Sequence, residues 1–296
     1  MIHPVKIIYS PLYEVDIGTH VFPTAKYRLI KDHLMNKYNL PGETFIEPRL
    51  VEKKEILRIH TEDYVGDIEN GTLSYADEIR LELPYSRELA KAALLCCGGT
   101  ILACQEAIRS GNCIHLGGGF HHAYPDHGEG FCIFNDIAVA AAVMADSGKK
   151  VLIIDCDLHQ GNGTAKIFEK EEKVFTFSIH QQNNYPFYKE KSDLDIGLED
   201  LTTGEEYNRL LTEGIRRIKK IFDPEIIIYV AGSDTYTDDQ LGGISLSMDD
   251  LKKRDVIIKT EAGDIPVAVV LAGGYAKNIE DTVLIHSNTA EVIAGL

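Results

Sequence analysis

Two carboxylates and an imidazole follow one apolar segment of the sequence at alternating positions. The segment, residues 151–154, is rich in branched side chains, which is typical of a buried parallel strand, and Asp155, Asp157 and His159 come next. Because side chains alternate along a strand, residues two apart tend to lie on one side near its end. Mixed oxygen and nitrogen donors favour zinc or another divalent transition metal over calcium or magnesium. The spacing therefore predicts a metal site at this strand end.

Polar side chains also follow three other predicted strands. His121 and His122 come after three glycines, whereas Asp234 follows an apolar run and Tyr275 follows two glycines. The carboxyl ends of parallel strands meet at one edge of a sheet, where ligands bind. Asp234 is the natural third ligand, because a catalytic zinc usually takes three protein ligands plus water. The adjacent imidazoles offer acid and base groups, and the hydroxyl of Tyr275 can donate to an oxyanion.

The elements that must position these side chains alternate between strand and helix. The pattern predicts an α/β fold, with one parallel sheet covered by helices on both faces and one domain over residues 1–296. Thr24, Ser86 and Asn135 are the expected caps of three of the helices. Residues 181–203 are expected to form a long loop. The six predicted strands are residues 5–9, 113–116, 151–154, 174–179, 226–231 and 267–271.

Composition excludes several other classes of protein. The chain has 296 residues, 44% of them hydrophobic, and a formal net charge of −16, which argues against binding to a nucleic-acid backbone. The acidity suits a cationic substrate, although it also keeps proteins soluble. The first ten residues are too short for a signal peptide, and no segment approaches the ~20 apolar residues of a membrane span. We therefore expect a cytoplasmic protein that does not contact a membrane.

Five segments, taken together and in this order, resemble the zinc-dependent histone deacetylase family. They are residues 117–122, 128–136, 155–164, 231–246 and 271–275. The likeness covers nearly the whole chain and is strongest to class IV and related bacterial enzymes. It implies an arginase/deacetylase fold and a hydrolase that removes acetyl or longer fatty acyl groups from lysine side chains of a protein or peptide substrate.

The resemblance also implies two metal sites. Asp157, His159 and Asp234 would hold one zinc ion per chain, and the metal would polarise the acyl carbonyl and lower the pKa of its water to about 7. A structural potassium ion would be bound by backbone carbonyls of a second group of residues. That group consists of Asp155, Asp157, His159, Ser178 and Ile179.

The catalytic roles follow from the same resemblance. His122 would be the general base and then the acid, and His121 an electrostatic partner oriented by Asp155. Tyr275 would donate to the oxyanion. Asn162 stands where class I enzymes carry a second aspartate behind the base. Because an amide stabilises an imidazolium less than a carboxylate does, we expect the pKa of His122 to be lower than in an aspartate-backed site.

Gly130, Phe131, Tyr185, Phe187 and Leu241 are the expected walls of a narrow substrate channel. Leu241 occupies the position that a polyamine deacetylase would make acidic, which favours acyl-lysine as the substrate. The segment before the long helix at 86–108 has no motif that matches the substrate-gripping aspartate of the family.

Several alternatives remain open at this point. The enzyme could instead deacylate a small amine such as an acetylpolyamine, or an acetoin-linked compound. A catalytically silent acyl-lysine binder is a non-enzymatic alternative. A two-metal ureohydrolase is disfavoured, because Gly161 stands where that pattern needs an aspartate. A dinucleotide-binding loop is disfavoured, because His122 occupies the third glycine position. The sequence does not indicate the oligomeric state.

Overall fold

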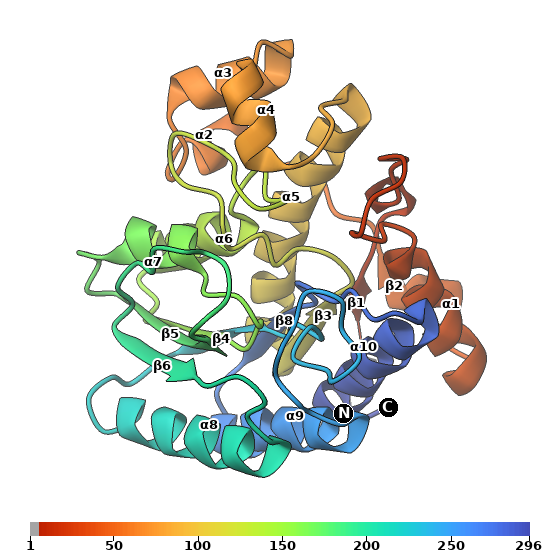
Figure 1. Cartoon of the computed structure of the whole chain (residues 1–296), viewed down its shortest axis with the longest axis vertical. Coiled ribbons are helices and arrows are strands. Elements are labelled where there is room, and N and C mark those ends of the chain that lie inside the picture. Colours follow the sequence, from red (N-terminus) through yellow and green to blue (C-terminus); the bar gives the residue numbers. More distant parts are fainter. Residues whose placement is uncertain (1–5) are drawn as a thin grey trace.

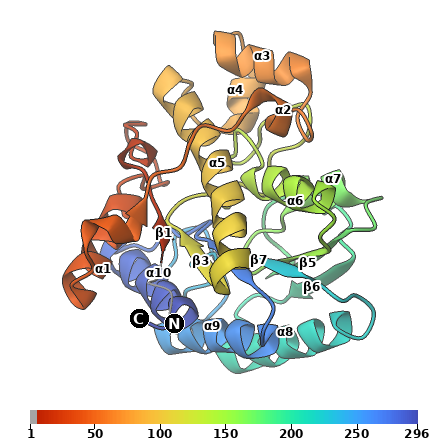
Figure 2. The ribbon, with the colours of Figure 1, turned by 180° about the vertical axis from the view of Figure 1, so that it is seen from behind.

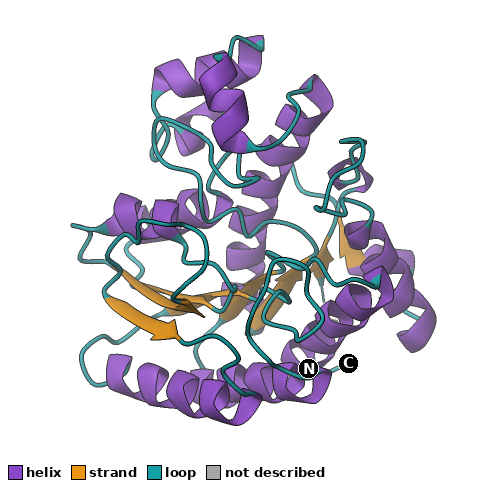
Figure 3. Cartoon of the chain, viewed as in Figure 1, coloured by secondary structure: helices purple, strands orange, loops and turns teal. Residues whose placement is uncertain are grey.

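The computed structural model describes residues 6–296, and their strands form one parallel sheet (Figure 3). Its order is β2-β1-β3-β8-β7-β4-β5-β6, and every neighbouring pair is parallel. The predicted strand at 5–9 is β1, although residue 5 lies outside the described range. The strands are β1 (Ile7–Ile8), β2 (Phe45–Ile46), β3 (Asn112–His115), β4 (Val151–Asp155), β5 (Val174–Gln181), β6 (Leu194–Leu198), β7 (Ile226–Val230) and β8 (Val267–Val270).

Helices cover both faces of this sheet, as the alternating pattern predicts (Figures 1 and 2). One layer holds α5, α6 and α7, and the opposite layer holds α1, α8, α9 and α10, while α2, α3 and α4 gather beyond one end of α5. The helices are α1 (Lys26–Tyr38), α2 (Lys53–Ile56), α3 (Glu62–Asn70), α4 (Tyr75–Leu81), α5 (Arg87–Ser110), α6 (Asp136–Asp146), α7 (Asn162–Phe168), α8 (Gly204–Ile218), α9 (Met248–Ala262) and α10 (Ile279–Ala294).

Strand β4 shows why the segment before the predicted metal site is wholly apolar. Val151 and Ile153 pack in the core between the sheet and α5, whereas Leu152 and Ile154 pack in the core on the opposite face. A central parallel strand is buried on both sides, so both sets of alternating side chains must be apolar. The first polar residue, Asp155, marks the point where the chain leaves this environment.

Helix α5 begins and ends where the sequence predicts. The Ser86 side chain accepts from Leu89 N, and Gly111 ends the helix. At Gly98 a methyl group would collide with the carbonyl of Arg49, so the glycine permits close backbone packing. The cost of glycine in a helix, about 1 kcal/mol relative to alanine, is offset by this contact.

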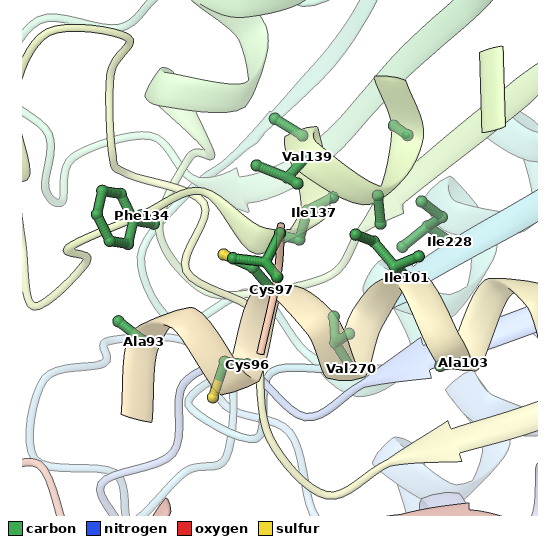
Figure 4. Close-up of a cluster of buried hydrophobic side chains, with 14 of the residues drawn as sticks. Ala93, Cys96, Cys97, Ile101, Ala103, Phe134, Ile137, Val139, Ile228 and Val270 are labelled. Carbon is green, nitrogen blue, oxygen red and sulfur yellow. The ribbon is translucent and has the colours of Figure 1, made fainter. Parts of the chain in front are cut away.

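The apolar length of α5 corrects one expectation. By length and composition alone this 24-residue helix could cross a membrane, but 72% of its apolar window is buried within the protein. Figure 4 shows its Ile101 in one buried cluster with Val139 of α6 and with Ile228 and Val270 of the sheet. The hydrophobicity of α5 is thus used in the core between the sheet and α6.

Four features of the fold differ from the sequence-based expectation. Strand β6 lies inside the expected loop 181–203, at the sheet edge. Its first four residues alternate between half-buried and exposed, only Leu198 is buried, and the strand has no apolar run. Strand β2 has only two residues, and α4 was not predicted. Thr24 does not cap α1, because its hydroxyl donates to the carbonyl of Val15 at 2.7 Å and Ala25 takes the cap position.

Candidate active site

Asp157, His159 and Asp234 converge beyond the carboxyl ends of β4 and β7, which are neighbours in the sheet. Ligand atoms of all three lie within 4.8 Å of one another. Nδ1 of His159 is 3.2 Å from Oδ1 of Asp157 and 3.3 Å from Oδ2 of Asp234. The structure therefore brings together the three residues that the sequence indicates as ligands.

The electrostatics of this cluster suit a bound cation. All three side chains are buried, and Oδ2 of Asp234 has no well-aligned hydrogen-bond partner among residues 6–296. Burial, with repulsion from Asp157, raises the pKa of Asp234 to about 7. Burial opposes charge on His159, but the hydrogen bond with Asp157 and the nearby negative charge of Asp234 raise its pKa to about 10. A divalent metal bound to the three side chains would replace the proton on His159 and neutralise the two carboxylates. The mixed set of oxygen and nitrogen donors suits a transition metal.

Backbone N–H groups hold both ligand carboxylates in place, and Oδ1 of Asp157 accepts from His159 N at 3.0 Å. Oδ2 of Asp157 accepts from Gly273 N at 2.9 Å, and Oδ1 of Asp234 accepts from Leu158 N at 2.9 Å. At Gly273 any side chain would collide with the Asp234 carboxylate, so this position requires glycine. The loops after β4, β7 and β8 are therefore locked together around the ligands.

His121 and His122 lie beside the metal cluster in the loop after β3. Nδ1 of His121 is 2.8 Å from Oδ2 of Asp155, and Nδ1 of His122 is 2.6 Å from Oδ1 of Asn162. The two Nε2 atoms are 3.1 Å apart. Each imidazole is thus held from behind by a different kind of group, a carboxylate for the first and an amide for the second.

These partners move the two pKa values in opposite directions. Burial disfavours a charged His121, but Asp155 and Asp157 outweigh it and raise the pKa to about 9. Burial and the positive charges of His121 and His159 hold the pKa of His122 well below its ordinary value. At neutral pH the first imidazole is therefore charged and the second is neutral. His122 is the group able to accept a proton.

Tyr275 approaches the cluster from the loop after β8. Its backbone N–H donates to Oδ2 of Asp239 at 2.7 Å, which fixes the loop, and its ring lines the same cavity as the metal ligands. Burial and the nearby charges of Asp157 and Asp234 raise the pKa of its hydroxyl well above the usual value. The hydroxyl therefore stays protonated and can donate a hydrogen bond.

A cavity of about 210 Å³ leads to these groups from the surface. Gly130, Phe131, Tyr185 and Leu241 line it, as the sequence predicts for a substrate channel. Phe187 does not line the cavity and is 87% exposed, because the loop directs it outward next to Tyr188. The expected role of Phe187 as a channel wall is therefore wrong.

Two buried cations that support the site were missed from the sequence. Nζ of Lys26 donates to the carbonyl of Ala272 at 2.6 Å, and burial, opposed by nearby carboxylates, lowers its pKa to about 8. Arg254 is fully buried in α9 and donates to the carbonyl of Gly232 at 2.5 Å, two residues before Asp234. The one sequence signal that could have indicated Lys26 and Arg254 was their position on the core-facing side of a predicted helix.

The sequence is similar to several known proteins over most of its length. A model of the histone deacetylase domain matches residues 20–290. An uncharacterized protein of Picosynechococcus sp. is 37% identical over 286 residues, which are 95% of each chain. Histone deacetylase 2 of Arabidopsis thaliana is 31% identical over 93% of this chain and 75% of that protein. The acetoin utilization protein AcuC of Staphylococcus aureus is 31% identical over 88% of this chain and 73% of that protein.

The fold is also that of a solved structure. The crystal structure of an HDAC homolog from Aquifex aeolicus aligns with a TM-score of 0.84 and 24% identity, over 98% of this chain and 84% of that chain. The predicted arginase/deacetylase fold is thereby confirmed. Because the family model spans most of the sequence and a named relative is 31% identical over 93% of it, the chain belongs to the histone deacetylase family.

Proposed function

We propose that this protein is a zinc-dependent hydrolase that removes acyl groups from the ε-amino group of lysine in proteins or peptides. The observation that carries the proposal is the convergence of a three-ligand cluster, a neutral imidazole and a protonated tyrosine at the inner end of one narrow cavity. Two carboxylates and one imidazole form a donor set that suits zinc.

The reaction divides among the residues of the cavity. A metal held by the three ligands supplies a Lewis acid for the acyl carbonyl and a water of lowered pKa. His122 accepts the proton of the attacking water and then delivers it to the leaving amine. His121 stays charged beside it and stabilises negative charge, and the hydroxyl of Tyr275 donates to the developing oxyanion.

The walls of the cavity support a long, uncharged substrate stem. Phe22, Phe120, Phe131, Tyr185 and Leu241 line it, so a methylene chain such as that of lysine can replace water there. Leu241 offers no charge to a second amine inside the channel. These features favour acyl-lysine over an acylated polyamine.

The space around the acyl group favours short chains. A second apolar hollow shares Phe22, Tyr27, Phe120 and Phe131 with the substrate cavity, but it holds only about 20 Å³. That is close to the space of one water molecule. We infer that acetyl fits directly, whereas a fatty acyl chain requires the stacked rings of Phe22 and Phe131, with centroids 6.3 Å apart, to separate.

A small acylated amine is the second candidate substrate. Glu82 is an exposed carboxylate that lines the cavity, and it can attract the free ammonium of a short polyamine. One relative is named for acetoin utilization, which also points to small molecules for that protein.

One panel of substrates tests both proposals. The zinc-loaded protein is assayed with lysine peptides that carry acyl groups of increasing length, and in parallel with acetylpolyamines. We expect acetyl-lysine peptides to give the highest kcat/KM. Hydrolysis of acetylpolyamines alone would replace the lysine proposal with the small-amine one, and no hydrolysis with any metal would refute both.

A structural potassium ion is a further part of the proposal. Asp155 and Ser178 are paired neighbours on β4 and β5, which brings two of the five expected residues together. Potassium is expected to raise the thermal stability of the protein, with sodium of equal ionic strength as the control.

A further inference from the structure

Glu129 lies directly behind Asn162, and although it belongs to segment 128–136, the sequence assigned it no role. Nδ2 of Asn162 donates to Oε1 of Glu129 at 2.7 Å, and Oδ1 of the same amide is 2.6 Å from Nδ1 of His122. The three side chains therefore form a continuous row of imidazole, amide and carboxylate. His122 has no carboxylate in direct contact with its Nδ1. The carboxylate of Glu129 reaches it only through the amide of Asn162.

This row determines which way the amide of Asn162 points. A carboxylate only accepts hydrogen bonds, so the amino end of the amide must face Glu129 and the carbonyl end must face His122. The carbonyl in turn requires a proton on Nδ1 of the imidazole. Nε2 of His122 then carries a lone pair, which is the form needed to accept a proton from water.

Glu129 is placed to carry a negative charge in this row. Its side chain is 18% exposed, and burial disfavours ionisation, but bonds with His127, Asn162 and Tyr185 outweigh burial and hold its pKa below the ordinary value. The amide of Asn162 also donates to the hydroxyl of Tyr124 at 3.3 Å, and this hydroxyl donates to Glu190.

The turn that holds Glu129 does not depend on the carboxylate. Its backbone N–H donates to Cys132 O at 3.1 Å, and Cys132 N donates back at 2.9 Å. Gly130 and Phe131 complete the turn, and their N–H groups donate to the carbonyls of Arg80 and Leu81. The carboxylate contacts His127 within the turn, and it contacts Asn162 and Tyr185 outside the turn.

We propose that Glu129 is a positioning residue that acts on His122 through the amide of Asn162. It fixes the imidazole in the base form and stabilises the positive charge that appears when the ring accepts a proton, as Asp155 does directly for His121. This inference rests on the proposed hydrolysis, in which His122 transfers the proton.

Three variants and one control test the proposal in the zinc-loaded enzyme. E129L removes both acceptor and charge and is expected to lower kcat about 10–100-fold with little change in KM. E129Q keeps the shape and one acceptor oxygen and should fall between E129L and the wild type. The control E172Q changes an exposed carboxylate in the turn before β5, and its kcat should stay within about two-fold of wild type.

The double variant E129Q/N162D separates relay from structure. It returns a carboxylate to direct contact with His122 and removes the second one that would repel it. Its kcat should recover to within about three-fold of the wild-type value, which a merely structural role of Glu129 does not predict. Wild-type kcat in both E129L and E129Q overturns the proposal, and so does a double variant no faster than E129Q.

A spectroscopic measurement keeps this test separate from the proposed function. Long-range ¹H–¹⁵N spectra of histidine-labelled protein report which ring nitrogen of His122 is protonated, with or without turnover. We expect Nδ1–H in the wild type and a mixture of tautomers in E129L. An unchanged tautomer in E129L overturns the inference, whereas an inactive wild type with the expected spectra overturns only the proposed hydrolysis.

Discussion

His121 and His122 are adjacent in one buried loop, yet their surroundings give them opposite properties. The first is paired with the carboxylate at the end of β4, which raises its pKa to about 9. The second faces the amide of Asn162 at the start of α7, and burial next to two positive rings holds its pKa low. The comparison teaches that the role of each imidazole is set by the element behind it rather than by the loop that carries it.

The proposed roles of both imidazoles require a metal bound by the neighbouring cluster of Asp157, His159 and Asp234. Asp157→Ala should abolish measurable turnover and remove the bound metal, because two remaining ligands make a poor site. Metal content per chain and kcat are measured together. Asp264→Ala, in the exposed turn between α9 and β8, is the control and should leave both unchanged. Turnover by a metal-free Asp157→Ala protein is incompatible with the assigned site.

Separate removal of the two imidazoles tests the comparison itself. His122→Ala removes the group that transfers the proton and should lower kcat about 10³-fold. His121→Ala removes only a neighbouring charge and should lower kcat about 10²-fold, since electrostatic support is lost while the base remains. Steady-state kinetics of metal-loaded proteins decide the order. If His121→Ala is the slower variant, the two roles must be exchanged.

Tyr275 differs from His122 in its proposed role, because its hydroxyl donates a hydrogen bond to the oxyanion but does not transfer a proton. Tyr275→Phe keeps the ring and removes the hydroxyl, and kcat should fall about 10²-fold with KM little changed. The pH dependence of kcat should keep its shape, since His122 still titrates. An unchanged kcat would exclude the hydroxyl from the chemistry.

The residues that end buried strands were the easiest to predict from the sequence. Asp155, Asp157 and Asp234 follow apolar runs that are buried on both faces, so the first charged residue marks the site. Ser86 and Asn135 were predictable as caps for a similar reason, because a cap has a local chemical cause.

Features that depend on contacts distant in sequence were not predictable. Strand β6 is held at an edge by pairing with β5, and its own residues show no apolar pattern. Lys26 and Arg254 contradict the rule that long cations are exposed, and only the folded chain supplies their carbonyl partners. Glu129 meets Asn162 across 33 positions, so no local spacing could indicate the pair.

The opposite environments of the two imidazoles also predict a pH dependence of stability in the metal-free protein. His121 has a folded pKa of about 9, above the ordinary value of 6.5, so its stabilising contribution is complete below pH 6.5 and is lost as pH rises through 9. His122 has a lowered folded pKa, so its contribution is present above pH 6.5 and is lost as pH falls.

The variants His121→Gln and His122→Gln should therefore differ from wild type at opposite ends of the pH range. Wild type should lose its advantage over His121→Gln, about 3 kcal/mol at most, between pH 6.5 and 9. Between pH 6.5 and 5 it should lose up to about 1.4 kcal/mol per pH unit relative to His122→Gln. Other buried histidines, such as His115 with its pKa of about 3, are present in both proteins and cancel in the difference. Urea unfolding at pH 5, 6.5 and 9 measures both slopes, and slopes of the same sign would contradict the opposite environments of the two rings.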